Sequence, residues 1–151
     1  MKNIRNQVEA DALEELHVPA FGHELLREVL LPEILGQEYP SMLYWAGRKL
    51  ARHYPLETAE ELPQFFALAG WGTLSLIHRK QGEMEFELSS DLIDARFKSQ
   101  KEPSFQLEAG FLAEQVQTIG KHAAEAYEQV KRRSGKVMLT VKWDKKDQID
   151  E

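Results

Sequence analysis

The chain has 151 residues, a formal net charge of −6 and no cysteine. A chain of about 150 residues suits a single domain, because folding buries about 70% of the surface that the unfolded chain exposes. The negative charge repels phosphate backbones and anionic membranes, so we expect no nucleic-acid partner. The absence of cysteine excludes disulfides, thiolate metal sites and cysteine nucleophiles, and it fits the reducing conditions of the cytoplasm, which is the expected location.

Residues 1–19 are expected to form a loose N-terminal arm. They contain no apolar stretch of the length that a signal peptide needs, and the chain has no run of about 18 apolar residues. We therefore expect neither secretion by a signal peptide nor stable membrane insertion. A single domain is expected over residues 20–144, followed by a charged tail over residues 145–151.

Three helices are predicted before any strand. Apolar residues between positions 21 and 35 recur at helical spacing. Pro32 is expected to end or kink this first helix, with a short turn beyond it that Gly36 closes. The second helix is predicted to follow Pro40 and to end before Pro55.

The third helix is predicted to end at Gly70, the residue type that most often adopts the left-handed conformation after a helix. Thr58 and Glu61 have the spacing of a capping box at its start. Pro63, just beyond this pair, would remove one early backbone hydrogen bond. The sequence therefore leaves open where the third helix starts.

From Trp71 the hydrophobic period changes to that of a strand. After a turn at Gly82, apolar residues alternate strictly with Glu83, Glu85 and Glu87, which predicts an antiparallel hairpin with one acidic face. Carboxylates on alternate strand residues line up without converging, so we do not expect a calcium site. We expect these acids to discourage pairing at a sheet edge.

A short helix capped within Ser89–Asp91 is predicted next, followed by a loop over residues 98–103. Residues 107–120 carry a stripe of apolar and small side chains and are predicted to form the central buried helix. A glycine inside a helix costs about 1 kcal/mol relative to alanine. Gly110, like Gly47 in the second helix, is therefore expected to mark close packing, and a tolerated neutral change is the alternative for Gly110.

A second hairpin is predicted near the end of the chain. Residues 124–132 alternate like a strand, although their composition favours a helix. Residues 137–143 form a clear strand after a turn signal at Ser134-Gly135, and this strand needs a neighbour. We therefore predict that residues 124–132 are that neighbour, and that the chain frays from Asp144.

Four segments carry a family resemblance: GWGTL, FELSS, FQLEAGFLAEQVQ and VMLTVKW, which begin at Gly70, Phe86, Phe105 and Val137. Together with LREVLLPEILGQEYPSMLYWAGRKLARHYPLE, they make nearly the whole chain resemble the YslB-like bacterial family of unknown function. More distantly, the chain is similar to the four-vinyl-reductase-like domain and the Bet3-type subunits of TRAPP tethering complexes.

This resemblance implies an α/β (α+β) domain in which helices pack on a twisted antiparallel sheet built from two hairpins. Domains of this kind often pair with themselves, and they bind small hydrophobic ligands or act as scaffolds. The cysteines that many of them carry are absent here. The resemblance therefore does not extend to covalent lipid attachment or to a cysteine metal site.

Five aromatic residues lie where the related domains build their apolar cavity, and they are the ligand-binding candidates: Tyr44, Trp45, Trp71, Phe105 and Phe111. Large rigid rings with an occasional polar edge suit such a cavity. Ordinary core packing uses the same residue types and is the alternative interpretation.

The remaining polar residues do not form a catalytic or metal-binding pattern. The histidines are scattered through the chain, at His17, His23, His53, His78 and His122, without metal-ligand spacing, so no metal, haem or other cofactor is expected. Glu108 and Glu114 are six residues apart and so on different helical faces, which favours solvated or interface roles over acid-base chemistry. Arg48, Lys49 and Arg52 could grip an anion, but a solvated helix face is expected.

We therefore predict a non-catalytic, cytoplasmic homodimer that binds a small apolar ligand or a protein partner. Pairing is suggested by a first helix that is more apolar than one buried face requires, at Leu30, Leu31, Ile34 and Leu35. The alternatives are a pure scaffold with a filled core, and an enzyme that uses Glu108, Tyr44 or His53.

Overall fold

The computed structural model describes residues 9–100 and 102–148, with side chains described as far as Asp144. The chain divides into two compact units, residues 1–39 and 40–151, which are described separately. The first unit contains a four-residue helix and then a continuous helical stretch: α1 (Ala10–Leu13), α2 (Ala20–Glu24), η2 (Leu25–Leu30), α3 (Leu31–Leu35) and η3 (Gly36–Glu38).

The helical stretch passes through Pro32 without ending there. The residues immediately before it, η2, form a π-helix, and Pro32 occupies the first turn of α3. The wider π turn relieves the clash that a proline ring makes with the preceding turn. The stretch closes at Gly36, whose φ of 73° lies in the region that favours glycine.

The second unit begins with three helical segments: α4 (Tyr39–His53), η4 (Ala59–Glu61) and α5 (Leu62–Leu68). The predicted capping box is wrong, because the described Thr58 side chain makes no cap hydrogen bond and the Glu61 carboxylate accepts from the Glu57 N–H at 3.3 Å. Pro63 instead lies in the first turn of α5, where its missing N–H is not needed. Gly70 follows α5 with a φ of 75°, as predicted.

The second unit contains a four-stranded antiparallel sheet of order β1-β2-β4-β3. Its strands are β1 (Thr73–Lys80), β2 (Glu83–Ser89), β3 (His122–Lys131) and β4 (Lys136–Gln148). Both predicted hairpins are confirmed, including the strand assignment of residues 124–131. β4 continues through Gln148, so the expectation that the chain frays from Asp144 is corrected as far as that residue.

The acidic residues of β2 do not protect a sheet edge, because β2 lies between β1 and β4. Their carboxylates instead pair with basic side chains of the neighbouring strands. Glu83 Oε2 lies 2.9 Å from His78 Nε2, and Glu87 Oε1 lies 3.3 Å from Lys136 Nζ. The hydrogen bond from His78 lowers the pKa of Glu83. The expectation failed because strand order cannot be read from the alternation of one strand.

Two helices follow the first hairpin: α6 (Asp91–Ser99) and α7 (Gln106–Gly120). The predicted cap of α6 is present, since Ser90 Oγ accepts from the Ile93 N–H at 3.1 Å. At the start of α7, the Glu128 carboxylate of β3 accepts from the Phe105 N–H at 3.0 Å, where a negative charge favours a helix N-terminus. Every residue from Glu108 to Val116 is buried, which confirms α7 as the central helix.

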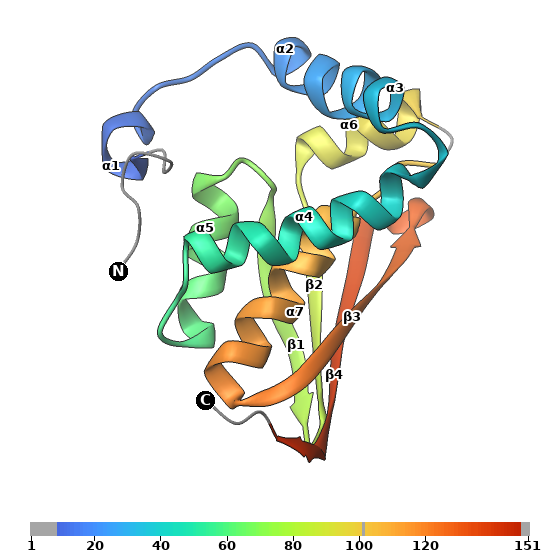
Figure 1. The fold of residues 1–151 in the computed structure, drawn as a ribbon. Coiled ribbons are helices and arrows are strands. Elements are labelled where there is room, and N and C mark those ends of the chain that lie inside the picture. Colours follow the sequence, from blue (N-terminus) through green and yellow to red (C-terminus); the bar gives the residue numbers. More distant parts are fainter. Residues whose placement is uncertain (1–8, 101, 149–151) are drawn as a thin grey trace. The chain divides into compact units, whose positions relative to one another are not determined.

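Within the second unit, α7 lies against the sheet, and α4 and α5 pack on α7 (Figure 1). The crossing of α4 and α7 depends on two glycines. A Cβ at Gly47 would lie 2.1 Å from the Leu107 carbonyl oxygen, and a Cβ at Gly110 would lie 2.0 Å from the Tyr44 carbonyl oxygen. The two backbones therefore meet at positions where only glycine fits.

Candidate functional site

Three of the five aromatic candidates pack in the core, and the other two line a hollow at the surface. Trp71 and Phe111 pack edge to face in the core, with ring centroids 5.3 Å apart, and Phe111 is fully buried. Phe105 is also fully buried and packs on Phe97. These three residues are core, as the alternative interpretation held.

Tyr44 and Trp45 lie elsewhere, at the surface of the second unit. They line an open hollow of about 390 Å³ together with residues of β3 such as Tyr127. Trp45 is 63% exposed, so it contributes little to the core.

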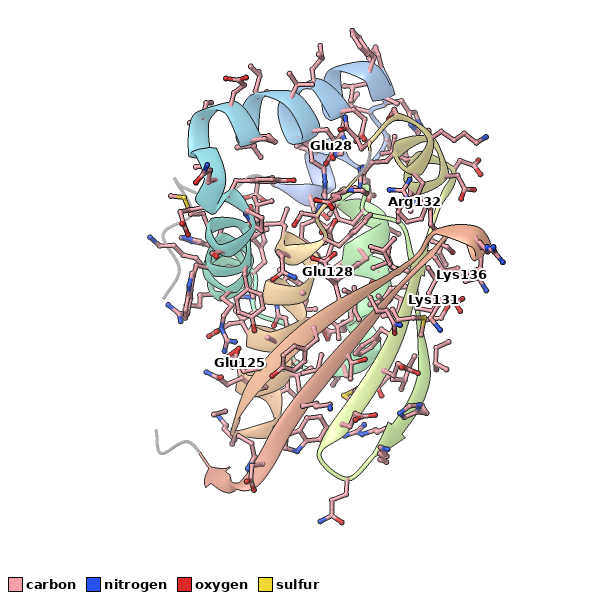
Figure 2. All side chains as sticks on the ribbon, turned by 90° about the vertical axis from the view of Figure 1, so that its right-hand side faces the viewer. Glu28, Glu125, Glu128, Lys131, Arg132 and Lys136 are labelled. Carbon is pink, nitrogen blue, oxygen red and sulfur yellow. The ribbon has the colours of Figure 1, made fainter. Side chains whose placement is uncertain are left out.

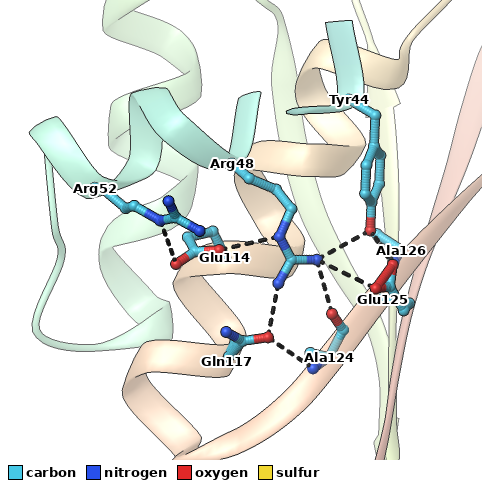
Figure 3. Close-up of polar contacts among 8 residues, drawn as sticks. All are labelled: Tyr44, Arg48, Arg52, Glu114, Gln117, Ala124, Glu125 and Ala126. Carbon is cyan, nitrogen blue, oxygen red and sulfur yellow. Dashed lines mark hydrogen bonds and ion pairs between the residues drawn. The ribbon is translucent and has the colours of Figure 1, made fainter. Parts of the chain in front are cut away.

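The hydroxyl of Tyr44 is the centre of a polar network between α4 and β3 (Figure 3). It donates to Glu125 Oε2 at 2.7 Å and accepts from Arg48 Nη1 at 3.2 Å and from the Ala126 N–H at 3.1 Å. Burial raises the pKa of Tyr44. The phenol therefore stays protonated at neutral pH and acts as a structural hydrogen-bond donor.

Arg48 is buried, which corrects the expectation that Arg48, Lys49 and Arg52 form one solvated face. Its Nε lies 3.0 Å from Glu114 Oε1, and its Nη2 lies 2.7 Å from Gln117 Oε1. Its Nη1 also donates to the Ala124 carbonyl at 2.9 Å. A buried guanidinium is tolerated when its donors are paired in this way, so Arg48 ties α4 to α7 and β3.

The two helical carboxylates are likewise not solvated, because Glu108 and Glu114 are both buried. Glu114 bridges two arginines, with its second oxygen 3.0 Å from Arg52 Nε. We call Tyr44, Arg48, Arg52, Glu114, Gln117 and Glu125 the Arg48 network. The network joins α4, α7 and β3 of the second unit through side-chain hydrogen bonds and ion pairs.

The residues of the enzyme alternative are not arranged as a site. The Tyr44 hydroxyl is engaged in the Arg48 network, His53 is exposed at the end of α4, and Glu108 is fully buried in α7. A fully buried carboxylate and an exposed imidazole do not face a common opening.

A more enclosed pocket lies at the C-terminal end of α7, between this helix, η4 and the sheet. Its volume is about 210 Å³. The described residues that line it come from six elements: Ala59, Arg79, Met84, Val116, Ile119, Gly120, His122 and Trp143. The lining is mainly apolar, as in most small-molecule sites.

His122 lines the pocket and carries a buried polar atom. His122 Nδ1 is buried and has no hydrogen-bond partner among the described residues. His122 follows directly on Lys121, which ends α7 in the left-handed conformation with a φ of 61°. The sharp reversal turns the chain from α7 into β3 at the pocket wall.

Sequence reasoning missed this pocket. Val116 and Ile119 were assigned to the buried stripe of α7, and Trp143 to the buried alternation of β4. Arg79 and His122 carried no motif. The sequence offered two signals for this pocket: Trp143 at the end of an alternating strand, and Gly120 at the end of a helix.

A further hollow of about 390 Å³ lies at the turn between β3 and β4. Figure 2 shows Lys131, Arg132 and Lys136 near this turn. Arg132 is already engaged, since its guanidinium donates to the carbonyl oxygens of Phe97 and Gln100. Lys136 pairs with Glu87. Two of these three basic side chains therefore already interact with groups of the same fold.

Two further features are absent from the described residues. No group of three or more His, Asp or Glu side chains is placed to hold a metal ion. In the same part of the chain, no helix combines the length and the apolar character needed to cross a membrane.

Comparison with known proteins identifies the family. A family model described as a protein of unknown function, DUF2507, matches residues 20–142. The chain belongs to this family. Uncharacterized protein YslB of Bacillus subtilis (strain 168) is 57% identical over 139 residues, which cover 92% of this chain and 94% of YslB. The YslB-type resemblance is therefore confirmed.

Solved structures confirm the fold type. A vinyl-4-reductase family protein from Methanocaldococcus jannaschii has a TM-score of 0.68 at 24% identity, over 93% of this chain and 90% of its own. The phenol-responsive sensory domain of the transcription activator PoxR, solved with phenol, has a TM-score of 0.59 at 15% identity, over 85% of this chain and 75% of its own. A trafficking protein particle complex subunit 3 from Naegleria fowleri is a more distant neighbour, with a TM-score of 0.48 at 8% identity, over 87% of this chain and 92% of its own. At these identities the likeness concerns the fold alone.

Proposed function

We propose that this domain binds a small, mostly apolar molecule in the pocket at the C-terminal end of α7, and that it is not an enzyme. The observation that carries the proposal is a mainly apolar pocket lined by His122, whose buried Nδ1 has no hydrogen-bond partner among the described residues. A buried polar group without a partner costs about 1–3 kcal/mol, which a ligand with one hydrogen-bonding group recovers. The volume of about 210 Å³ is sufficient for a one-ring molecule, since a cavity of about 150 Å³ holds benzene.

The fold relatives support a binding role. PoxR's sensory domain, which shares the fold, was solved with phenol, a one-ring molecule with one hydroxyl. The family match over residues 20–142 supports the treatment of residues 20–144 as one domain. A scaffold with a filled core and a domain that recruits a protein partner are the competing functions.

The charges inside the second unit support a non-catalytic role. The buried Arg48 and Glu114 neutralise each other, and the Tyr44 phenol is held as a donor. Catalytic groups are generally placed in a cleft with a strongly perturbed pKa. Tyr44 and Glu83 are two described residues with a shifted pKa, and neither of them lines the pocket.

Thermal unfolding with one-ring probes tests the binding proposal. Toluene, phenol and 3-phenylpropionate are added separately, and a probe at 100 times its Kd stabilises the fold by about 2.7 kcal/mol. For a chain of this length, that raises the Tm by about 5–10 °C. No response to any of the three probes contradicts the proposal and favours a filled scaffold.

Gly120 provides matched variants for this test, because it lines the pocket and a Cβ there meets no atom within 4 Å. Gly120→Phe occupies pocket space and removes the response. Gly120→Ala adds one methyl group and keeps it. A response that survives in Gly120→Phe shows that the probe binds elsewhere.

We further propose that the protein is a cytoplasmic homodimer that pairs through the helical stretch of residues 20–35. This stretch exposes six large apolar side chains: Phe21, Leu25, Leu26, Val29, Leu30 and Ile34. The exposed fraction reaches 74% at Phe21 and 73% at Ile34, and a second copy of the same stretch would cover such a surface. Sedimentation at high concentration tests this: the wild-type chain is expected to be a dimer, and Ile34→Glu a monomer. A monomeric wild-type chain removes the dimer proposal without affecting the pocket.

A further inference from the structure

The charged group at the α7 pocket indicates the chemical class of its ligand. Arg79, His122 and Trp143 are the side chains with nitrogen atoms among the described lining residues, Arg79 is the one with a permanent charge, and none of those residues is an Asp or Glu. A positively charged group at an apolar pocket suits a molecule with an apolar body and one anionic end.

A β-bulge turns Arg79 toward the pocket. Residues directly opposite each other in an antiparallel pair share a face of the sheet. In β1, Leu74 and Leu76 are opposite the buried Leu88 and Phe86, so even-numbered residues lie there on the face of the sheet that carries the core. The register then shifts between Leu76 and His78.

After this shift, Arg79 is opposite Met84, which is 3% exposed and also lines the pocket. Without the bulge, the alternation would place His78 and Lys80 on the core face and Arg79 on the other. Bulges commonly re-aim a side chain in this way. The β-bulge in β1 therefore places Arg79 at the pocket.

The neighbouring basic residues of β1, His78 and Lys80, pair with Glu83, whereas Arg79 has no carboxylate partner among the described residues. His78 Nε2 lies 2.9 Å from Glu83 Oε2, and Lys80 Nζ lies 3.7 Å from the same oxygen. In the part of the chain that the structure describes, no carboxylate lies within ion-pair distance of the Arg79 guanidinium. An arginine left without a carboxylate at a pocket is available to an anionic ligand.

His122 also lines the same pocket. Its Nδ1 is buried and without a partner among the described residues. Nδ1 carries a proton in one neutral tautomer and in the imidazolium, and in either form it donates to a carboxylate oxygen.

One feature of the pocket opposes an anion, namely the C-terminal end of α7 at Gly120. The partial negative charge of a helix C-terminus weakens binding of a unit charge by about twofold to fivefold. A hydrogen bond to a charged group strengthens binding by about tenfold to a hundredfold. The Arg79 contact therefore outweighs the helix terminus.

We propose that the ligand is a small carboxylic acid whose apolar body is about the size of one ring with a short chain. Its carboxylate is held by the Arg79 guanidinium and by His122 Nδ1–H. Its body packs between α7 and Trp143. This inference rests on the proposed binding function and adds the charge of the ligand to it.

Two matched probes test the charge. The affinities of the full chain for 3-phenylpropionate and for the neutral 3-phenylpropan-1-ol are measured by NMR titration. The wild-type chain is expected to bind the acid at least about tenfold more tightly than the alcohol. Arg79→Gln is expected to remove this preference and to leave the affinity for the alcohol within about twofold.

Arg133→Gln is the control, because it makes the same change of charge at an exposed arginine that does not line the pocket. It is expected to keep the preference for the acid. An equal effect of both variants would mean that general charge causes the preference, and this would overturn the inference.

The two proposals fail in different ways. If the alcohol binds as tightly as the acid, and Gly120→Phe abolishes both, the pocket binds ligands but the inference about the carboxylate is wrong. If neither probe binds at millimolar concentration, both the binding function and this inference are wrong. A preference for the acid that persists in Arg79→Gln also overturns the assignment of Arg79.

Discussion

Arg48 of α4 and Glu114 of α7 form a buried ion pair, with Nε and Oε1 3.0 Å apart and both side chains less than 10% exposed. Around it, the Arg48 network connects two helices to the edge strand β3. The pair therefore holds α7 in place above the sheet, and α7 forms one wall of the pocket.

Removal of Arg48 leaves the buried Glu114 carboxylate with only the exposed Arg52 as an ion-pair partner among the described contacts, and it leaves Gln117 Oε1 and the Ala124 carbonyl without this donor. We expect Arg48→Ala to lower the free energy of unfolding by about 3–5 kcal/mol. Arg52→Ala is the matched control, because Arg52 pairs with the same carboxylate from a position that is 62% exposed. It is expected to cost at most about 1 kcal/mol. Urea unfolding measures both values, and equal costs would contradict the account of the network.

Gly110 is expected to tolerate no side chain. A Cβ there would lie 2.0 Å from the Tyr44 carbonyl oxygen, which is backbone and cannot move aside alone. Gly110→Ala should therefore lower the free energy of unfolding by about 1–3 kcal/mol or more, as for overpacked cores. Gly120→Ala in the same helix has open space and should lie between no change and a gain of about 1 kcal/mol. Similar losses for both variants would show that α4 and α7 are not in close contact.

The raised pKa of Tyr44 predicts a loss of stability at alkaline pH. Between the ordinary value of 10.0 and the raised value, the folded protein keeps the Tyr44 proton while the unfolded chain releases it. The unfolded state then binds fewer protons, so the free energy of unfolding falls as pH rises through this window. The stabilising contribution is fully present below pH 10.0.

Tyr44→Phe isolates this effect from other groups that titrate at high pH. The variant should be less stable at neutral pH, because the Glu125 carboxylate and the Ala126 N–H lose their partner. Its stability should fall less steeply than that of the wild-type chain above pH 10.0. Parallel pH profiles for the two proteins, from denaturant unfolding, would refute the assignment.

The cap of α6 gives a local stability test. Ser90 Oγ accepts from the Ile93 N–H, so Ser90→Ala should cost about 1 kcal/mol. Ser99→Ala at the other end of α6 is the control, since the exposed Ser99 hydroxyl bonds only to carbonyls of its own helix among the described contacts. It should change the free energy of unfolding by less than about 0.5 kcal/mol. A result in the opposite order would exclude Ser90 as the cap.

Local sequence patterns predicted most elements of this fold. The alternation after Trp71 and after Gly135 identified both hairpins, and the small-residue stripe identified α7. These signals are local, because each depends on the period of one element against its nearest packed face. The pairing of β2 with β4 was beyond such reasoning, and for that reason the function assigned to Glu83, Glu85 and Glu87 was wrong.

Sites that depend on several elements were harder to predict. The sequence suggests a surface arginine at position 48, since its acceptors on α7 and β3 lie 66 or more residues away in the chain. In the sequence, Arg79 is one of three consecutive basic residues. Only the bulge between Leu76 and His78 decides which of them faces the pocket. The aromatic residues do not decide between the two interpretations, because core packing and cavity lining use the same side chains.

Native mass spectrometry of the purified protein, compared with its denatured mass, tests the central claim of ligand binding most directly. The wild-type chain and Gly120→Ala, expressed in a bacterial host, are predicted to carry the same additional noncovalent mass. Gly120→Phe is predicted to lack it, because its side chain occupies the pocket. The same additional noncovalent mass on wild-type and Gly120→Phe, or none on wild-type, would contradict the claim that the pocket at the end of α7 is a binding site.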